Sequence, residues 1–118
     1  MMFESIANRR KSYNDILNKM GAQEKRIITC FSFNPPLDNW FKIRNYTGIN
    51  QDSIKRAISN LSTDEISVDG KMIRNYKKVL IEIGSDKNPE TGKSITRYRL
   101  MTAQELDEFH NNFQESLF

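Results

Sequence analysis

The sequence predicts a mainly α-helical domain that carries a small β-hairpin, an α+β fold. Apolar residues recur at helical spacing through the first half of the chain, whereas they follow strand spacing within residues 79–100. Residues that favour turns separate these segments. The 118 residues are 37% hydrophobic and 10% aromatic, which is enough for one domain with a modest core and argues against a disordered chain.

Residues 1–21 are predicted to form an N-terminal helix with a basic arm. The helical pattern covers residues 4–20 and ends at Gly21. Three consecutive cations precede its apolar stripe, and they could contact a phosphate backbone or be a solvated charge run. Arg9 and Arg10 are the candidates for a DNA-contacting arm. The apolar stripe consists of Tyr13, Ile16, Leu17 and Met20.

Two further helices are expected before the middle of the chain. Residues 23–33 place apolar side chains on one side, which predicts a core helix. The Asn-Pro-Pro run at 34–36 ends that helix, because proline lacks an N–H and restricts the residue before it. Another helix is expected over residues 38–46, with Trp40 and Phe41 as anchors in the core.

Residues 51–61 read as a short amphipathic helix that follows a tight turn. Gly48 can adopt the positive φ that closes the preceding helix, and Asn50 is a suitable N-cap. The side opposite the apolar stripe is short, polar and basic, which suits the floor of a DNA major groove. The alternative is that this side is polar only because it is solvated. The candidate DNA contacts are Asn50, Gln51, Ser53, Lys55, Arg56, Ser59 and Asn60.

Residues 62–78 allow two readings. The Asp69-Gly70 pair could turn a β-hairpin between two short strands. Alternatively, the apolar residues between 72 and 80 lie at helical spacing and Asp69 caps a basic helix over residues 70–80. In that second reading the basic helix competes with residues 51–61 for the recognition role, and residues 51–61 are favoured.

Two strands and a polar loop are predicted for residues 79–100. Residues 79–83 are rich in β-branched side chains, and residues 94–100 alternate clearly. The loop at 85–93 contains strong turn residues. A two-stranded ribbon with a basic tip after a helix-turn-helix is a wing. Its candidate phosphate or minor-groove contacts are Lys87, Lys93 and Arg97.

Residues 102–118 are predicted to form an acidic amphipathic helix. Thr102 and Glu105 have the spacing of a capping box. The apolar stripe of this helix either packs on its own domain or pairs with a second copy, and a homodimer is favoured because two-fold proteins bind two half-sites. His110 is expected at the surface beside the stripe. The predicted dimer interface is Leu106, Phe109, Phe113 and Leu117.

The distribution of charge favours contact with phosphate. Residues 1–101 hold 18 Lys/Arg against 11 Asp/Glu, a net charge of +7, whereas residues 102–118 carry −4. There is no apolar run of membrane-spanning length and no evident secretory signal. Cys30, the single cysteine, is expected to be a buried thiol. These features predict a cytoplasmic protein without a membrane partner.

Three segments carry a family likeness: Tyr13-x-x-Ile16 ahead of Lys25-Arg26-Ile27-Ile28, then TGINQDSIKRAISNL, then VLIEIGSDKNPETGKSITRYRL. With them the chain resembles the winged helix-turn-helix superfamily, and most of all the short proteins of phages, prophages and mobile elements. The resemblance implies DNA binding in a regulatory setting, with residues 22–101 as the winged domain. Residues 62–78 depart from the family pattern, in which the recognition helix passes to the wing within a few residues.

No motif predicts catalysis, a metal site or a cofactor. Residues 88–94 end like a phosphate-binding loop, but the glycine that the motif needs five residues before Gly92 is Lys87, and a strand follows instead of a helix. The sequence therefore predicts a sequence-specific double-stranded DNA-binding protein, a transcriptional regulator of phage or mobile-element type. The alternative is a protein-interaction module (an adaptor, a host-factor inhibitor or a structural component), which would expose an apolar patch.

Overall fold

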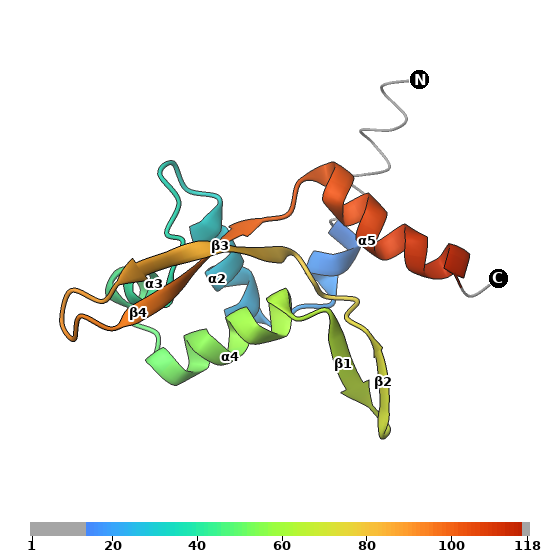
Figure 1. Cartoon of the computed structure of the whole chain (residues 1–118), viewed down its shortest axis with the longest axis horizontal. Coiled ribbons are helices and arrows are strands. Elements are labelled where there is room, and N and C mark those ends of the chain that lie inside the picture. The colour runs from blue at the N-terminus through green and yellow to red at the C-terminus, as the bar shows by residue number, and fades with distance from the viewer. Residues whose placement is uncertain (1–13, 117–118) are drawn as a thin grey trace.

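The computed structural model describes the backbone of residues 14–116 and the side chains of residues 14–110. A short helical segment at 14–18 comes first. The elements that follow in chain order are α2 (Ala22–Phe31), α3 (Trp40–Thr47), α4 (Gln51–Ser62), β1 (Glu65–Val68), β2 (Lys71–Arg74), β3 (Leu80–Lys87), β4 (Ser94–Leu100) and α5 (Ala103–Ser116) (Figure 1). The strands form two separate antiparallel hairpins. The prediction of a mixed α and β fold is confirmed.

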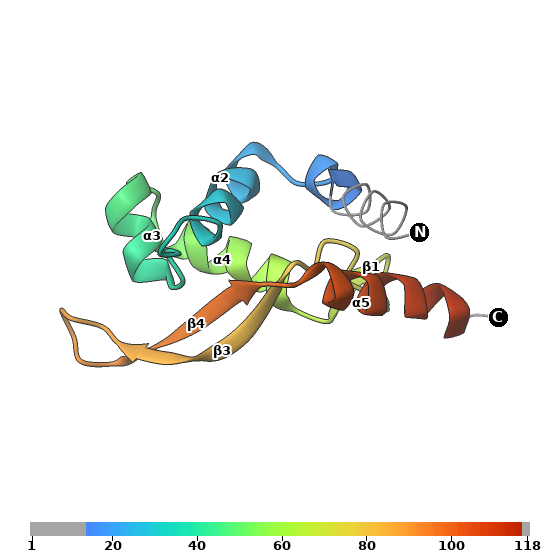
Figure 2. The ribbon, with the colours of Figure 1, turned by 90° about the horizontal axis from the view of Figure 1, so that it is seen from above.

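The hydrophobic core gathers around α4. Ile54 and Leu61 on this helix are fully buried, together with Ile27 of α2 and Ile43 of α3. Figure 2 shows α4 between α2 on one side and the β3–β4 hairpin on the other. The apolar stripe predicted for residues 51–61 is confirmed, and the side of α4 that turns away from the core is left open.

The turn between α3 and α4 follows the sequence signals. Gly48 adopts a φ of +75° and its N–H bonds to the Arg44 carbonyl, which ends α3. Asn50 then caps α4, since its side chain accepts from the N–H of Asp52 at 2.8 Å. The start of α3 differs by two residues from the prediction. Asn39 is its N-cap and accepts from the N–H of Lys42 at 2.9 Å.

Residues 65–74 form the β1–β2 hairpin, so the helical reading of residues 70–80 is wrong. Asp69 and Gly70 have φ values of +53° and +79°, the two positive angles that a type I′ hairpin turn requires. The strands pair from Glu65 with Arg74 to Val68 with Lys71. The basic residues after Gly70 are therefore not presented on a helix, and α4 is left as the basic amphipathic helix of the chain's centre.

The β3–β4 hairpin is longer than predicted, because β3 continues to Lys87. Its register is interrupted by a bulge between Glu82 and Gly84. The loop at 88–93 is held by its own backbone, where the N–H of Asn88 donates to the Lys93 carbonyl at 2.7 Å. A further bond, from the N–H of Tyr98 to the carbonyl of residue 38, joins β4 to the linker before α3.

Helix α5 begins with the predicted capping box. Thr102 Oγ1 accepts from the N–H of Glu105, whose carboxylate accepts from the N–H of Thr102. Leu106 is buried in the core and Phe109 is partly buried against it, so these two side chains pack on their own domain. Leu106 is thus not available to a second copy. Phe113 and Leu117 lie outside the described side chains. Among the described residues, no helix has an apolar stretch that could cross a membrane.

Candidate nucleic-acid interface

The open side of α4 carries two exposed cations, Lys55 and Arg56. Four of the predicted contacts, Lys55, Arg56, Ser59 and Asn60, are exposed on it. No carboxylate in the described part of the chain forms an ion pair with Lys55 or Arg56. Both charges are therefore free to meet an anionic partner.

The DNA contacts predicted at the start of α4 are mostly engaged within the protein. The Asn50 side chain is occupied as the helix cap, and Gln51 and Ser53 are half-buried. Asp52, which is exposed in the first turn, complements the partial positive charge of the helix N-terminus. The polar contacts that α4 can offer therefore concentrate in its second and third turns.

Two aromatic rings of α3, Trp40 and Phe41, contact cationic side chains beside α4. The Lys55 ammonium lies 5.1 Å from the centre of the Trp40 ring, and the Arg44 guanidinium lies 5.3 Å from the same ring. Phe41 contacts Trp40 edge-on and stacks with Arg44. Trp40 is partly buried against the core as expected, whereas Phe41 is half-exposed. The two aromatic rings hold cationic side chains at the surface next to α4.

A groove of about 290 Å³ runs between α4 and β4. Hydroxyl groups from both elements face it, and Trp40 and Tyr98 supply its aromatic walls. Burial, together with the nearby Glu82 carboxylate, raises the pKa of Tyr98 above its ordinary value. The lining residues are Trp40, Lys55, Ile58, Ser59, Ser62, Ser94, Ile95, Thr96 and Tyr98.

Two predicted lysines lie at the end of the β3–β4 hairpin. Lys87 pairs in register with Ser94, so both side chains share one face of the hairpin, and Ser94 lines the groove. Lys87 and Lys93 are exposed and form no ion pair with a described carboxylate. The loop lies at the same end of the molecule as α3 and the N-terminus of α4 (Figures 1 and 2). Its Glu90 forms a 3.1 Å ion pair with Arg44.

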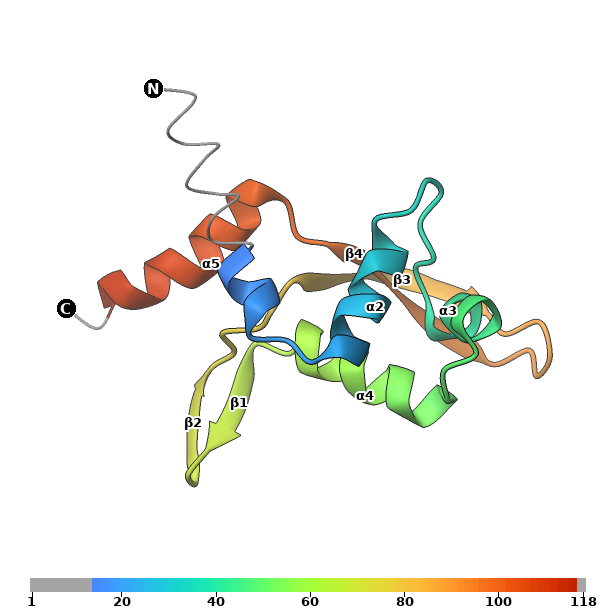
Figure 3. The same cartoon turned by 180° about the vertical axis from the view of Figure 1, so that it is seen from behind.

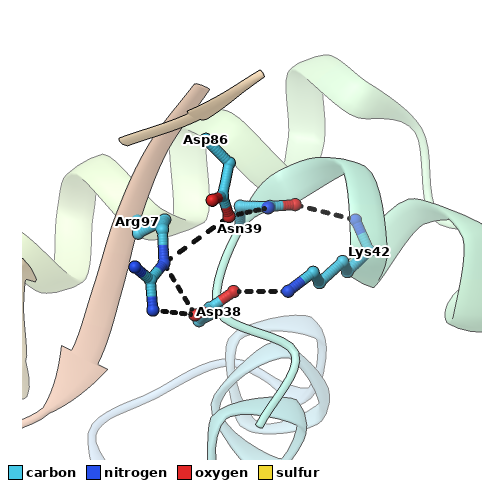
Figure 4. Close-up of polar contacts among 5 residues, drawn as sticks. All are labelled: Asp38, Asn39, Lys42, Asp86 and Arg97. Atoms are coloured by element: carbon cyan, nitrogen blue, oxygen red, sulfur yellow. Dashed lines mark hydrogen bonds and ion pairs between the residues drawn. The ribbon is translucent and has the colours of Figure 1, made fainter. Parts of the chain in front are cut away.

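Arg97 does not have the free guanidinium that the sequence predicts. It forms ion pairs with Asp38 at 3.0 Å and with Asp86 at 3.5 Å (Figure 4). Burial raises the pKa of Asp38, but hydrogen bonds from Lys42 and Arg97 outweigh it and hold the pKa below its ordinary value. Arg97 is thus engaged within the protein, and its predicted role as a phosphate contact is not supported by this geometry.

The same polar cluster joins three segments of the chain. Asp86 of β3 accepts from the Asn39 side chain at 3.2 Å, and Asn39 caps α3. Lys42 reaches back to Asp38 at 3.1 Å. The β3–β4 hairpin is therefore fastened to the first turn of α3, which sets its orientation relative to α4.

The groove between α4 and β4 was not predicted from the sequence. Ser94 and Thr96 lie two residues apart on β4, and the strand alternation already placed Thr96 and Tyr98 on one face. What no local pattern could indicate is that this face lies beside α4. Arg9 and Arg10, the predicted arm, lie outside the described residues.

The described residues contain no group of three or more His, Cys, Asp or Glu side chains that could hold a metal ion. Comparisons with protein-family models, with curated proteins and with solved structures returned no match.

Proposed function

We propose that this protein binds double-stranded DNA sequence-specifically, as a transcriptional regulator of phage or mobile-element type. In this proposal α3, the turn at 48–50 and α4 form a helix-turn-helix, and the β3–β4 hairpin is its wing. The observation that carries the proposal is the open face of α4, where Lys55 and Arg56 lack carboxylate partners among the described residues.

The arrangement assigns different roles to the cations. Arg56 projects from the middle of α4 and is the candidate for reading a base edge, because arginine can form two hydrogen bonds to guanine. Lys87 and Lys93, at the hairpin loop, are candidates for contacts to phosphate. One DNA backbone strand would run between the bases contacted by α4 and the phosphates contacted by the hairpin loop. The groove between α4 and β4 would receive this strand, with Lys55 and Ser59 on one wall.

The protein-interaction alternative requires an exposed apolar patch at one of two places. On α4 the exposed residues are polar or charged. On α5 the predicted apolar stripe begins with Leu106, which is buried in the core. Neither place shows such a patch among the described side chains, which on α5 end before Phe113. The open cationic face of α4 therefore favours the DNA-binding proposal of the two.

The first test measures the binding of a random-sequence duplex by fluorescence anisotropy between ~50 and ~200 mM salt. We expect micromolar affinity that falls steeply with salt, because each phosphate contact releases condensed counterions. A protein that does not bind at the lowest salt would contradict the proposal.

A matched pair of double variants locates the contact surface. Lys55→Gln with Arg56→Gln removes two charges from α4, and Lys25→Gln with Arg26→Gln removes two exposed charges from α2, which packs on the buried side of α4. We expect the α4 variant to lower the slope of log K against log salt by about two, and the α2 variant to leave it unchanged. Equal effects of both variants would mean that only net charge matters.

A further inference from the structure

The β1–β2 hairpin stands at the C-terminal end of α4 and projects away from the body of the protein. In Figures 1 and 3 it extends toward the lower edge of the view, which is also the side of α4 that faces away from α2 and the β3–β4 hairpin. A long partner laid against the open face of α4 would therefore meet this hairpin.

The root of the hairpin is firmly held. Asn75, which follows β2, is fully buried, and its side-chain amide donates to the carbonyls of Asn60 at 2.7 Å and Thr63 at 2.9 Å. The Arg74 guanidinium donates to the carbonyl of Phe109 in α5 at 3.2 Å. With the tight turn at its tip, the hairpin is organised before any partner arrives, so little conformational entropy remains to be lost on binding.

Each face of its tip carries one exposed apolar side chain beside a polar or charged one. Met72 is 63% exposed and lies opposite Ser67, whereas Val68 is 40% exposed and lies opposite Lys71 on the other face. Only one cation and one anion, Lys71 and Asp69, flank them at the turn. Exposed apolar side chains on a thin, rigid projection are suited to entering a narrow apolar space rather than to covering a flat surface.

We propose that the β1–β2 hairpin is a second DNA-contacting element, which inserts Met72 and Val68 into the minor groove beside the major groove that α4 occupies. This inference rests on the proposed function. Apolar wedges of this kind enter between base steps from the minor groove, unstack them partly and bend the duplex. A side chain on each face lets the hairpin contact the base pairs on both sides of the opened step.

The charges around the hairpin agree with an apolar wedge rather than an electrostatic contact. At its root Asp64 forms an ion pair with Lys78, and Glu65 is the register partner of Arg74, so the two acidic side chains there lie beside cations. The contribution of the hairpin should consequently depend little on salt, unlike that of α4.

The experiment compares Met72→Ala with Met72→Leu in the full-length protein, on a duplex carrying the site selected with the wild type. Binding is measured by anisotropy at several salt concentrations, and bending by energy transfer between dyes at the two ends. For Met72→Ala we expect about tenfold weaker binding, an unchanged salt slope and a smaller bend, because the buried apolar surface is lost. Met72→Leu should keep both the affinity and the bend.

The outcomes separate this inference from the proposed function. If the wild type binds DNA and the double substitution at Lys55 and Arg56 weakens it, but Met72→Ala binds and bends like the wild type, only the hairpin inference is overturned. If the wild type does not bind DNA at all, the proposed function fails. If Met72→Ala instead changes the mass of the protein in solution and leaves bending intact, the hairpin is a protein-contact surface and the inference is wrong.

Discussion

The Arg97 guanidinium lies 3.0 Å from the carboxylate of Asp38, a residue 59 positions earlier, and this ion pair fastens the β3–β4 hairpin to the start of α3. Asp38 is only 5% exposed. A buried carboxylate needs its charge partners, so the pair fixes the position of the hairpin more firmly than a surface salt bridge would.

Arg97→Ala is expected to destabilise the protein by about 1–3 kcal/mol, because it leaves Asp38 buried with Lys42 as its remaining cation. Urea unfolding followed by circular dichroism measures this loss. Arg26→Ala, which removes an exposed arginine on α2, is the control and should change the free energy of unfolding by less than about 0.5 kcal/mol. Equal stabilities of the two variants would show that the Asp38 contact is weak.

Arg56→Ala should cost about 1–3 kcal/mol of DNA-binding free energy and reduce the preference for the selected site over other sequences. Lys93→Ala should instead weaken binding to all sequences alike and lower the salt slope by about one. Competition assays with the selected duplex and a scrambled duplex distinguish the two variants. If Arg56→Ala lost affinity equally for every sequence, the residue would not read bases.

Asn75→Ala should lower the free energy of unfolding by about 2–4 kcal/mol, since it removes a fully buried amide and leaves the carbonyls of Asn60 and Thr63 without its N–H donors. Thermal and urea unfolding both measure the loss. Asn45→Ala, at an exposed position of α3, is the matched control and should stay near wild type. A stable Asn75→Ala protein would mean that water replaces the amide at this junction.

Stability should fall as the pH drops below the ordinary histidine pKa of about 6.5, because of His110. Burial lowers the pKa of His110, and Lys19, Arg74 and Lys78 lower it further, although a bond to the Lys78 carbonyl opposes this. In neutral histidine the Nε2–H donates to that carbonyl at 2.9 Å. The unfolded chain therefore binds the proton more readily than the folded protein.

The urea midpoint should accordingly be constant above about pH 7 and decrease toward pH 5. His110→Gln removes the titrating group while keeping an N–H donor, and its stability should depend less on pH over this range. A wild-type midpoint that rises on acidification would show that the histidine gains a proton more easily in the folded state.

The features that the sequence predicts well are those decided by neighbouring residues. Gly48 and Asn50 mark the turn between α3 and α4, and Thr102 with Glu105 marks the start of α5, because capping depends on groups within four residues of each other. The type I′ turn at Asp69-Gly70 is equally local. Its signal competed with the helical spacing of the apolar residues that follow, and backbone pairing between β1 and β2 decided the outcome.

Features that depend on distant partners could not be predicted. The alternation of β4 correctly places Arg97 on the face opposite Tyr98. No residue close to Arg97 in the sequence indicates that Asp38 is its ion-pair partner. The spacing of Leu106 predicts an apolar stripe on α5, and only the packing of the chain shows that the first part of that stripe enters the core. For the same reason the groove between α4 and β4 is a property of the fold and not of any single segment.

The buried side chain of Asn75 links the last turn of α4 to the exit of the β1–β2 hairpin through two hydrogen bonds, which fix where the hairpin leaves the helix. If α4 and the hairpin both contact DNA, the protein sets the distance along the duplex between their two contact sites. The bases read by Arg56 and the step opened by Met72 would then have a fixed separation, and inserting one base pair between them would turn the step away from the hairpin by about a tenth of a helical turn. Spacing, as well as sequence, would define the recognised site.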